Sequence, residues 1–109
     1  MTDIDPNKAI DFMLTHAPKL AKAKADRIYM EEFRKTIKAR LMASCSEPSL
    51  GAQERDAYAS DEYEDHLHAL QAAVEAEEVL RWQMIAAQAR VDVWRSQEAS
   101  NRRIDRSAQ

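Results

Sequence analysis

The chain has 109 residues, enough for one domain, and its one glycine and three prolines leave few places where a helix must end. The single cysteine excludes an internal disulfide and a cysteine-based zinc site, and it fits a reducing compartment. No apolar run approaches the roughly 20 residues that cross a bilayer, and the acidic N-terminus lacks the pattern of a signal peptide. We therefore expect an all-α cytoplasmic protein that does not enter a membrane.

The net charge of −3 conceals four segments of alternating sign. Residues 1–15 carry one cation and three acids, a balance of −2, and residues 16–46 carry eight cations and three acids, a balance of +5. Residues 47–78 carry one cation and ten acids, a balance of −9, and residues 79–109 carry six cations and three acids, a balance of +3. A small overall charge therefore does not exclude a local basic surface that binds nucleic acid.

Two helices are expected in the N-terminal half of the chain. Asp5 and Pro6 have the pattern of an N-cap followed by the first helical residue, which predicts a short helix within residues 1–17. Pro18 suits the first turn of a second helix, because its missing N–H would be unpaired there anyway. We expect this basic helix to span residues 18–45. Its apolar stripe recurs at helical spacing and consists of Met30, Phe33, Ile37 and Leu41.

The C-terminal half is expected to contain a connector and one long helix. Residues 46–60 are interpreted as the connector, because they include a proline and the only glycine, and a short helical turn is expected near its end. Ser60 has the pattern of an N-cap, and the acids after it favour the positive end of a helix dipole. The following helix is predicted to span residues 61–105, before a tail of residues 106–109. At 1.5 Å per residue, such a helix is roughly 65 Å long.

The apolar residues of a helix this long need a partner, which is either the basic helix folded back on it or another subunit. We therefore predict a helical hairpin with a short N-terminal helix and a long C-terminal helix. The hairpin is expected to assemble into a homo-oligomer, such as a ring. The residues predicted to lie at the interface between subunits are Leu67, Leu70, Val74, Met84, Val91 and Trp94.

The cations of the basic helix raise the main question of function. At 100° per residue, Arg27, Arg34 and Lys38 lie within about 40° of one another. They form either the solvated face of a helix or a surface for phosphates. The small number of i,i+4 acidic partners, such as Glu31 for Lys35, favours the second interpretation. The candidate nucleic-acid-binding residues are Lys24, Arg27, Arg34, Lys35, Lys38 and Arg40.

Two further patterns accompany these cations. The rings of Tyr29 and Phe33 lie close enough in sequence to stack on bases of a single strand, although Phe33 also belongs to the apolar stripe. The C-terminal half repeats the spacing of the basic stripe at Arg95, Arg102 and Arg106. The first pattern favours single-stranded nucleic acid as a ligand, while the second has no assigned role.

The order of residues in this region resembles a known family. The segment HAPKLAKAKADRIYMEEFRKTIKARL, residues 16–41, is similar to the basic helix of the UvsY-type phage recombination mediators. Its IKARL stretch looks like the Lys-Ala-Arg signature of that family, so that Lys38 and Arg40 correspond to the signature cations. The segment ERDAYASDEYEDHLHALQAAVEAEEVLRW, residues 54–82, is similar to the acidic stretch and long second helix of the family.

The resemblance implies a small helical protein that oligomerises through its C-terminal portion and binds single-stranded DNA. It also implies two protein partners, a strand-exchange recombinase and the single-strand-binding protein that the recombinase replaces with the help of the mediator. If the chain is phage-encoded, the expected location is the host cytoplasm.

Patterns of catalysis or metal binding are weak throughout the sequence. His66 and His68 are two residues apart and point to different faces of a helix, so they do not form a helical metal pair. Cys45 has no evident base to activate it, and no phosphate loop or nucleophile elbow is found. We therefore expect no catalytic residue, no metal and no cofactor, and a protein that is not an enzyme.

Two alternatives to a recombination mediator stay open. The protein can be a helical adaptor or inhibitor whose acidic segment, residues 47–78, meets a basic protein partner. It can also be a structural component of an assembly, such as a small phage morphogenesis protein.

Overall fold

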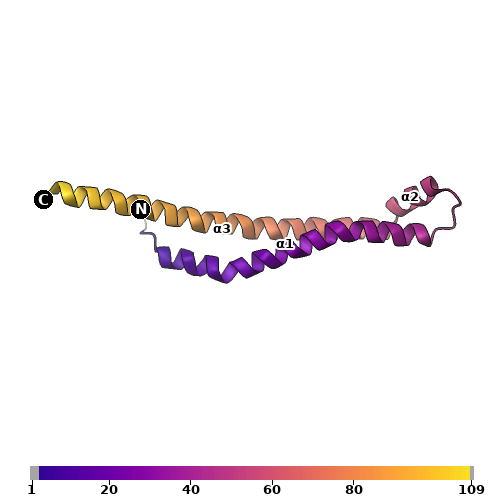
Figure 1. The fold of residues 1–109 in the computed structure, drawn as a ribbon, viewed down its shortest axis with the longest axis horizontal. Coiled ribbons are helices and arrows are strands. Elements are labelled where there is room, and N and C mark those ends of the chain that lie inside the picture. The colour runs from indigo at the N-terminus through magenta and orange to yellow at the C-terminus, as the bar shows by residue number, and fades with distance from the viewer. Residues whose placement is uncertain (1–2, 109) are drawn as a thin grey trace. The chain divides into compact units, whose positions relative to one another are not determined.

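The structure, a computed structural model, describes residues 3–108 and shows three α-helices and no strand over that range (Figure 1). α1 spans Pro6–Ala43, α2 spans Leu50–Tyr58 and α3 spans Asp61–Ala108. The predicted all-α fold and the long C-terminal helix are therefore confirmed.

Two predicted boundaries in the C-terminal half shift by a few residues. The connector predicted at residues 46–60 contains α2, a helix of nine residues where a short helical turn is expected. The tail predicted at residues 106–109 is helical as far as Ala108, and Gln109 lies outside the described residues. The long helix therefore extends a few residues beyond its predicted end.

α1 begins where the sequence predicts. The Asp5 Oδ1 accepts hydrogen bonds from the backbone N–H groups of Asn7 and Lys8, at 2.9 and 3.4 Å. These bonds satisfy two of the four N–H groups that the first turn of a helix leaves unpaired. Pro6 occupies the first helical position, where its missing N–H costs nothing. Residues 1–2 of the predicted first helix lie outside the described residues.

The predicted helix boundary at Pro18 is wrong, because α1 continues through this residue. A proline inside a helix removes the hydrogen bond to the carbonyl four residues earlier, here that of Leu14, at a cost of about 3 kcal/mol or more. Leu14 and Pro18 are both exposed, so the affected turn lies at the water-accessible side of α1. Alternating Ala and Lys residues after Pro18 have high helix propensity and favour continuation. The short N-terminal helix and the basic helix are therefore one element.

One hydroxyl group organises the corner between α2 and α3. The Ser60 Oγ accepts a hydrogen bond from the N–H of Tyr63 at 3.2 Å and donates one to the carbonyl of Ala57 at 2.7 Å. The first turn of α3 also carries three acids that interact favourably with the helix dipole, namely Asp61, Glu62 and Glu64. The predicted N-cap at Ser60 is thus confirmed, and the same side chain also ends α2.

The chain divides into two compact units. Met1–Leu20 and Val79–Gln109 form the first, here called the terminal unit. In this unit Ala9 of α1 packs with Ala87 and Val91 of α3, and two half-buried side chains lie against this cluster, Phe12 and Met13. Apolar side chains therefore hold the terminal unit together.

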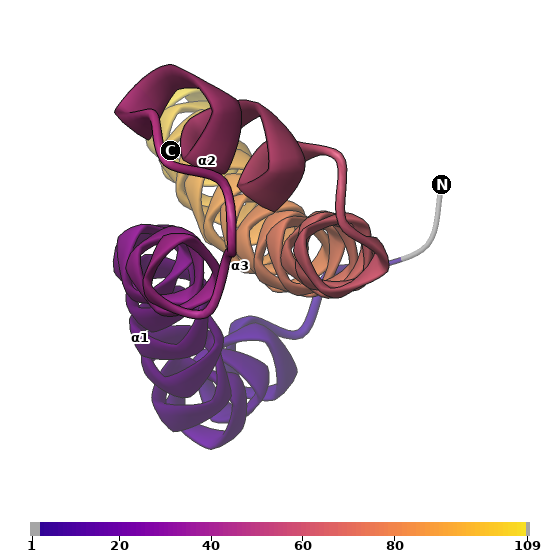
Figure 2. The same ribbon diagram turned by 90° about the vertical axis from the view of Figure 1, so that its right-hand side faces the viewer.

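Ala21–Glu78 form the second unit, here called the hairpin unit, in which α2 lies beside α1 and α3 (Figure 2). Polar contacts join its helices. The His66 Nε2 lies 2.7 Å from the carbonyl oxygen of Met30, and the His66 ring is tilted against that of Phe33 with 6.1 Å between centroids. The antiparallel pairing of α1 with α3 in this unit is the arrangement expected of a helical hairpin.

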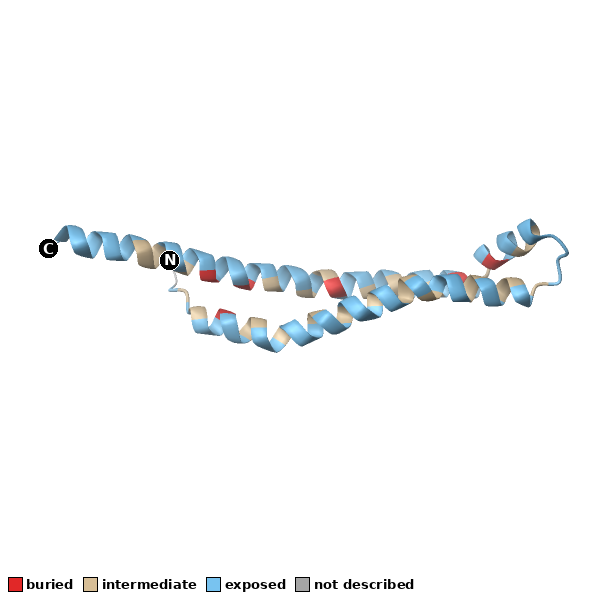
Figure 3. Ribbon diagram, in the orientation of Figure 1, coloured by how far each residue is buried: buried red, intermediate tan, exposed pale blue. Residues whose placement is uncertain are grey.

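The inward-facing residues of α3 follow a regular spacing of three and four residues (Figure 3). The buried and half-buried residues at this spacing are Tyr63, His66, Leu70, Ala73, Glu77, Leu80, Met84, Ala87, Val91, Trp94 and Glu98. This heptad pattern is typical of two helices packed side by side. A glutamate within it, Glu77, marks a point where the packing is polar.

The six residues predicted to lie between subunits belong to two different faces of α3. Val91 is buried in the core of its own chain, so its side chain is not available to a second subunit. Leu67 and Val74 lie one residue off the inward spacing, and they are 43% and 38% exposed. The half-buried residues of the predicted set are Leu70, Met84 and Trp94. The seam inferred from the sequence therefore combines an inward face with an exposed flank.

Candidate nucleic-acid interface

Three of the six candidate cations line one groove of the hairpin unit. α1 contributes Arg34, Lys35 and Lys38, and the corner between α2 and α3 contributes the rings of Tyr58 and Tyr63. The groove has a volume of about 590 Å³, and its lining is completed by Ala39 and Met42. We call it the tyrosine–cation groove. Its combination of cations and aromatic rings is typical of sites for single-stranded nucleic acid.

The two tyrosine rings of the groove differ in exposure. Tyr63 is buried, and its ring meets that of Tyr58 edge to face, with 5.0 Å between centroids and 81° between planes. Tyr58 is 47% exposed. The buried ring thus fixes the exposed one, and the Ser60 corner brings the two together. An exposed ring held in this way is suited to stacking on a base.

Lys38 is held between two groups of α2. Its Nζ lies 2.9 Å from the Glu54 Oε1 and 4.8 Å from the centroid of the Tyr58 ring. The Tyr58 and Glu54 side chains both raise the pKa of Lys38 above its ordinary value of 10.5. Lys38 is therefore fully protonated at neutral pH, and an anion that enters the groove competes with Glu54 for it.

The other two cations of the groove are more accessible than Lys38. The Lys35 Nζ pairs with Glu32 at 3.0 Å, but the two side chains are 72% and 68% exposed, so solvent screens this pair and leaves it weak. Arg34 is exposed, and no described carboxylate lies within 4 Å of it. Arg34 is therefore the cation of the groove that is most available to a phosphate.

Arg27 is placed away from this groove, in the packing between α1 and α3. Its guanidinium group donates hydrogen bonds to both carboxylate oxygens of Glu77 and to both of Glu31. The side chains of Arg27 and Glu77 are only 23% and 12% exposed. Glu77 and then Glu31 raise the pKa of Arg27 above its usual range. Arg27 is thus not one of the cations that line the groove, and two carboxylates occupy its donors.

Lys24 and Arg40 do not line the groove either. Lys24 is exposed and has no described ion-pair partner, three residues before the Arg27 cluster. The Arg40 guanidinium lies 5.6 Å from the centroid of the Phe33 ring, and Phe33 stacks on Tyr29 at 5.6 Å with an angle of 14°. Because Tyr29 is 66% exposed, this stack presents a second aromatic surface. Arg40 therefore belongs to a different face of α1 from Arg34 and Lys38.

The basic helix meets more acids than its i,i+4 partners alone would supply, and the expected pair of Glu31 with Lys35 is not formed. Glu31 pairs with Arg27 and not with Lys35, which pairs with Glu32 instead. Two further carboxylates arrive from the acidic segment, Glu54 on Lys38 and Glu77 on Arg27. The physical reason is that α2 and the first part of α3 return along α1. A count of i,i+4 partners on one helix cannot detect acids that other helices supply.

Sequence reasoning missed Tyr58 and Glu54, the two residues of α2 that act on Lys38. The available signal was weak. Tyr58 precedes Tyr63 by five residues, and Ser60 between them has the pattern of an N-cap, which predicts a sharp change of direction. Such a corner brings side chains on its two sides together. What the sequence does not reveal is how far α2 folds back toward α1.

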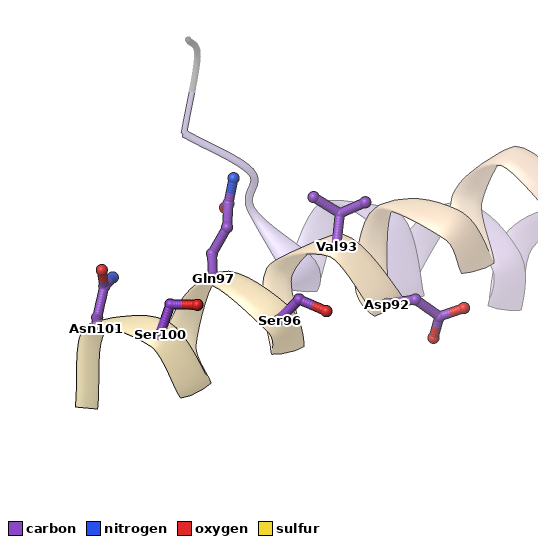
Figure 4. A pocket seen from close by; sticks show the side chains of 6 residues that line it. All are labelled: Asp92, Val93, Ser96, Gln97, Ser100 and Asn101. Carbon is purple, nitrogen blue, oxygen red and sulfur yellow. The ribbon is translucent and has the colours of Figure 1, made fainter. Parts of the chain in front are cut away.

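Another hollow lies along α3, with a volume of about 420 Å³ (Figure 4). Its lining carries one acid and no cation, so it is not suited to an anion, and it consists of Asp92, Val93, Ser96, Gln97, Ser100 and Asn101. No group of three or more metal-ligand side chains is found among residues 3–108. Over the same range, none of the helices has the length and apolar character needed to cross a membrane.

Comparisons of the chain with protein-family models, with curated proteins and with solved structures give no match.

Proposed function

We propose that the protein binds single-stranded DNA through the tyrosine–cation groove and acts as a recombination mediator. The observation that carries the DNA-binding part is the presence of three cations and one exposed, fixed tyrosine ring in a single groove. Cations attract the phosphates of a strand, while an aromatic ring stacks on any base. The groove is therefore suited to DNA of any sequence.

The cations of the groove would exchange their carboxylate partners for phosphates. Arg34 accepts a phosphate without losing a described ion pair, and the Lys35 pair with Glu32 is solvent-screened and easily replaced. Lys38 must leave Glu54, and the negative charge of Glu54 then lies beside the strand. We therefore expect Arg34 to contribute most to affinity and Lys38 to contribute least.

The role in recombination comes from the resemblance to the UvsY-type mediators, which matches Lys38 and Arg40 to the signature cations of that family. The proposed partners are a strand-exchange recombinase and the single-strand-binding protein that it replaces. A mediator is expected to be present where the DNA is, in the cytoplasm of a phage host. It speeds the exchange without catalysing a chemical step.

We also propose that the protein is a homo-oligomer. Large apolar side chains remain exposed on α3, including Trp82 at 58%, Leu67 and Val74. Exposed apolar side chains in such numbers favour association between copies of a chain. A Leu67→Gln/Val74→Gln variant should have a lower mass in light scattering than the wild type, with unchanged helicity. An Ala72→Gln variant is the matched control, and an equal loss of mass in it would contradict the role of the two residues.

An adaptor or inhibitor for a basic protein is the second candidate. Its support is that Asp61, Glu62 and Asp65 are exposed at the start of α3 and have no described ion pair. A triple change of these acids to Asn or Gln should abolish binding to a basic partner but leave DNA binding intact. Loss of DNA binding in that variant, with the oligomer retained, would instead show that this face contacts the strand.

The groove is tested by binding to a fluorescein-labelled oligothymidylate, measured by anisotropy over a series of salt concentrations. An Arg34→Ala/Lys35→Ala variant should weaken binding and flatten the salt slope by up to about 1.4, since each contact with a single strand contributes about 0.7. The matched control is Lys19→Ala/Lys22→Ala, which removes two exposed cations of α1 outside the groove. Equal slopes in all three proteins would refute the groove as the site.

The stacking role of Tyr58 has its own test. Tyr58→Ala should reduce affinity about 5- to 150-fold, because base–aromatic stacking contributes about 1–3 kcal/mol. Tyr58→Phe keeps the ring and should retain nearly all of the affinity. If the two variants bind equally well, the ring does not stack on a base.

A further inference from the structure

The last residues of α3 differ from the rest of the chain in exposure. Residues 100–108 are exposed on every side of the helix, as the end of α3 in Figure 3 shows. We call this stretch the terminal segment. A helix that packs on nothing gains no stability from burial, and its propensity alone is marginal in water. A helix of this kind is stabilised when a ligand binds it.

The terminal segment is rich in unpaired cations. It carries three arginines and one aspartate, a net charge of +2. The three arginines are Arg102, Arg103 and Arg106. No described carboxylate lies within 4 Å of their guanidinium groups, whereas the cationic groups of Arg27, Lys35 and Lys38 each have such a partner. The terminal segment therefore places three cations without a described ion pair within five residues of one another.

Compensation of the helix dipole does not account for this cluster. Cations in the last turn of a helix are favourable because of the partial negative charge there, but the effect falls off within that turn. Only Arg106 lies in the last turn of α3. Arg102 and Arg103 lie one turn earlier, where the dipole gives them little stabilisation.

Arg102 and Arg106 also share a face with Arg95. At 100° per residue these three lie within about 40° of one another, and they are separated along the axis by about 10 and 6 Å. Arg95 is exposed, and its pair with Asp92 is long, at 3.9 Å. One strand that runs along α3 can therefore contact all three guanidinium groups. Guanidinium groups bind phosphates with two parallel hydrogen bonds, which suits them to this task.

A protein partner fits the terminal segment less well than a phosphate chain. A helix that docks in a protein groove needs apolar anchors at several successive turns. The terminal segment has one large apolar residue, Ile104. Its charge, by contrast, is complementary to any polyanion.

We propose that the terminal segment, together with Arg95, is a second site for the phosphates of single-stranded DNA, separate from the tyrosine–cation groove. This site rests on the proposed function for the identity of the ligand but not for its location. It gives each unit of the chain its own phosphate-binding surface.

The test uses the full-length chain and the same labelled oligothymidylate. Arg102→Ala/Arg103→Ala/Arg106→Ala should flatten the salt slope by up to about 2, from three contacts at about 0.7 each. Alanine keeps the helix propensity high, and circular dichroism verifies that helicity is retained. The control variant, Lys19→Ala/Lys22→Ala/Arg55→Ala, removes three exposed cations elsewhere and should bind like the wild type.

The outcomes separate this inference from the proposed groove. If only the groove variant flattens the slope, the terminal segment is not a site, while the proposed function stands. If only the terminal variant does so, the second site is supported and the groove is refuted. A wild type that binds no oligothymidylate would overturn both. If polyglutamate of matched charge competes as well as DNA, the segment recognises an acidic protein, and the assignment to phosphates is wrong.

Discussion

The hairpin unit and the terminal unit are built from the same two helices but are held together in different ways. In the hairpin unit, the contacts between α1 and α3 include the Arg27–Glu77 ion pair and the His66 bond to a backbone carbonyl. In the terminal unit they are apolar, between Ala9, Ala87 and Val91. One chain thus combines a unit whose helices are joined by ion pairs and a unit whose last three arginines, Arg102, Arg103 and Arg106, have no described ion pair.

This difference shows that the net charge of a segment does not reveal whether its charged side chains are available to a ligand. The basic segment of the sequence meets acids of α2 and α3, so that only part of its charge remains for a ligand. In the smaller basic excess of residues 79–109, the arginines at the end of α3, Arg102, Arg103 and Arg106, have no described ion pair. Availability is decided by what the fold places opposite each cation.

Removal of Glu77 should have the largest effect on stability. Glu77→Ala leaves Arg27 half-buried with one carboxylate instead of two, and breaking a buried pair costs more than the pair is worth. The melting temperature should fall by roughly 5–15 °C. Arg27→Leu/Glu77→Leu removes both charges and should recover most of the loss. If the double variant is as unstable as the single one, the pair contributes more than this comparison implies.

A core change in the terminal unit should have the next largest effect. Val91→Ala removes two buried methyl groups and should lower the free energy of unfolding by about 1–3 kcal/mol, measured in urea. The matched change two residues on, Val93→Ala, affects a side chain that is 44% exposed and should cost less than about 0.5 kcal/mol. Equal losses would show that α3 does not face inward as described.

A smaller effect is expected on the titration of Lys38. Tyr58→Phe should lower the pKa of Lys38 toward its ordinary value of 10.5, and Glu54→Gln should lower it less, because Tyr58 is the larger cause of the shift. NMR of the Nζ group measures both. Since the folded state raises this pKa, the associated stability is present below pH 10.5 and is lost as the pH rises through the folded value. An unchanged pKa in both variants would contradict the contacts of Lys38 with α2.

The smallest effect is expected from the terminal segment. Arg102→Ala/Arg103→Ala/Arg106→Ala should change the free energy of unfolding by less than about 0.5 kcal/mol, since these side chains make no described ion pair in the folded chain. A clear loss of stability in urea would show that these arginines have a structural role. It would also remove the contrast between the two units.

The sequence allowed the helical fold and most helix ends to be predicted, because caps and breakers act locally. The hydrogen bonds of Asp5 and Ser60 are examples, and each depends on residues within three positions of the cap. Pro18 shows the limit of this approach. Its cost to the helix is outweighed by the strong helix formers around it.

The candidate site was predicted less completely. Arg34, Lys35 and Lys38 were found from their spacing on one helix, and the structure brings them together. Arg27 has the same spacing, yet it is bonded to a carboxylate 50 residues away in sequence. The groove also requires Tyr58, whose place depends on how α2 returns. Long-range pairing of this kind has no signature in a single sequence.

Pro18 has a consequence for the cooperativity of unfolding. The part of α1 that belongs to the terminal unit ends at Leu20, and Pro18 lies two residues before that point. A continuous ladder of backbone hydrogen bonds couples neighbouring turns of a helix, and Pro18 interrupts that ladder close to the division. The chain is therefore expected to depart from two-state behaviour. Amide hydrogen exchange should resolve two opening free energies, one for each unit, where an uninterrupted hairpin would give a single global value.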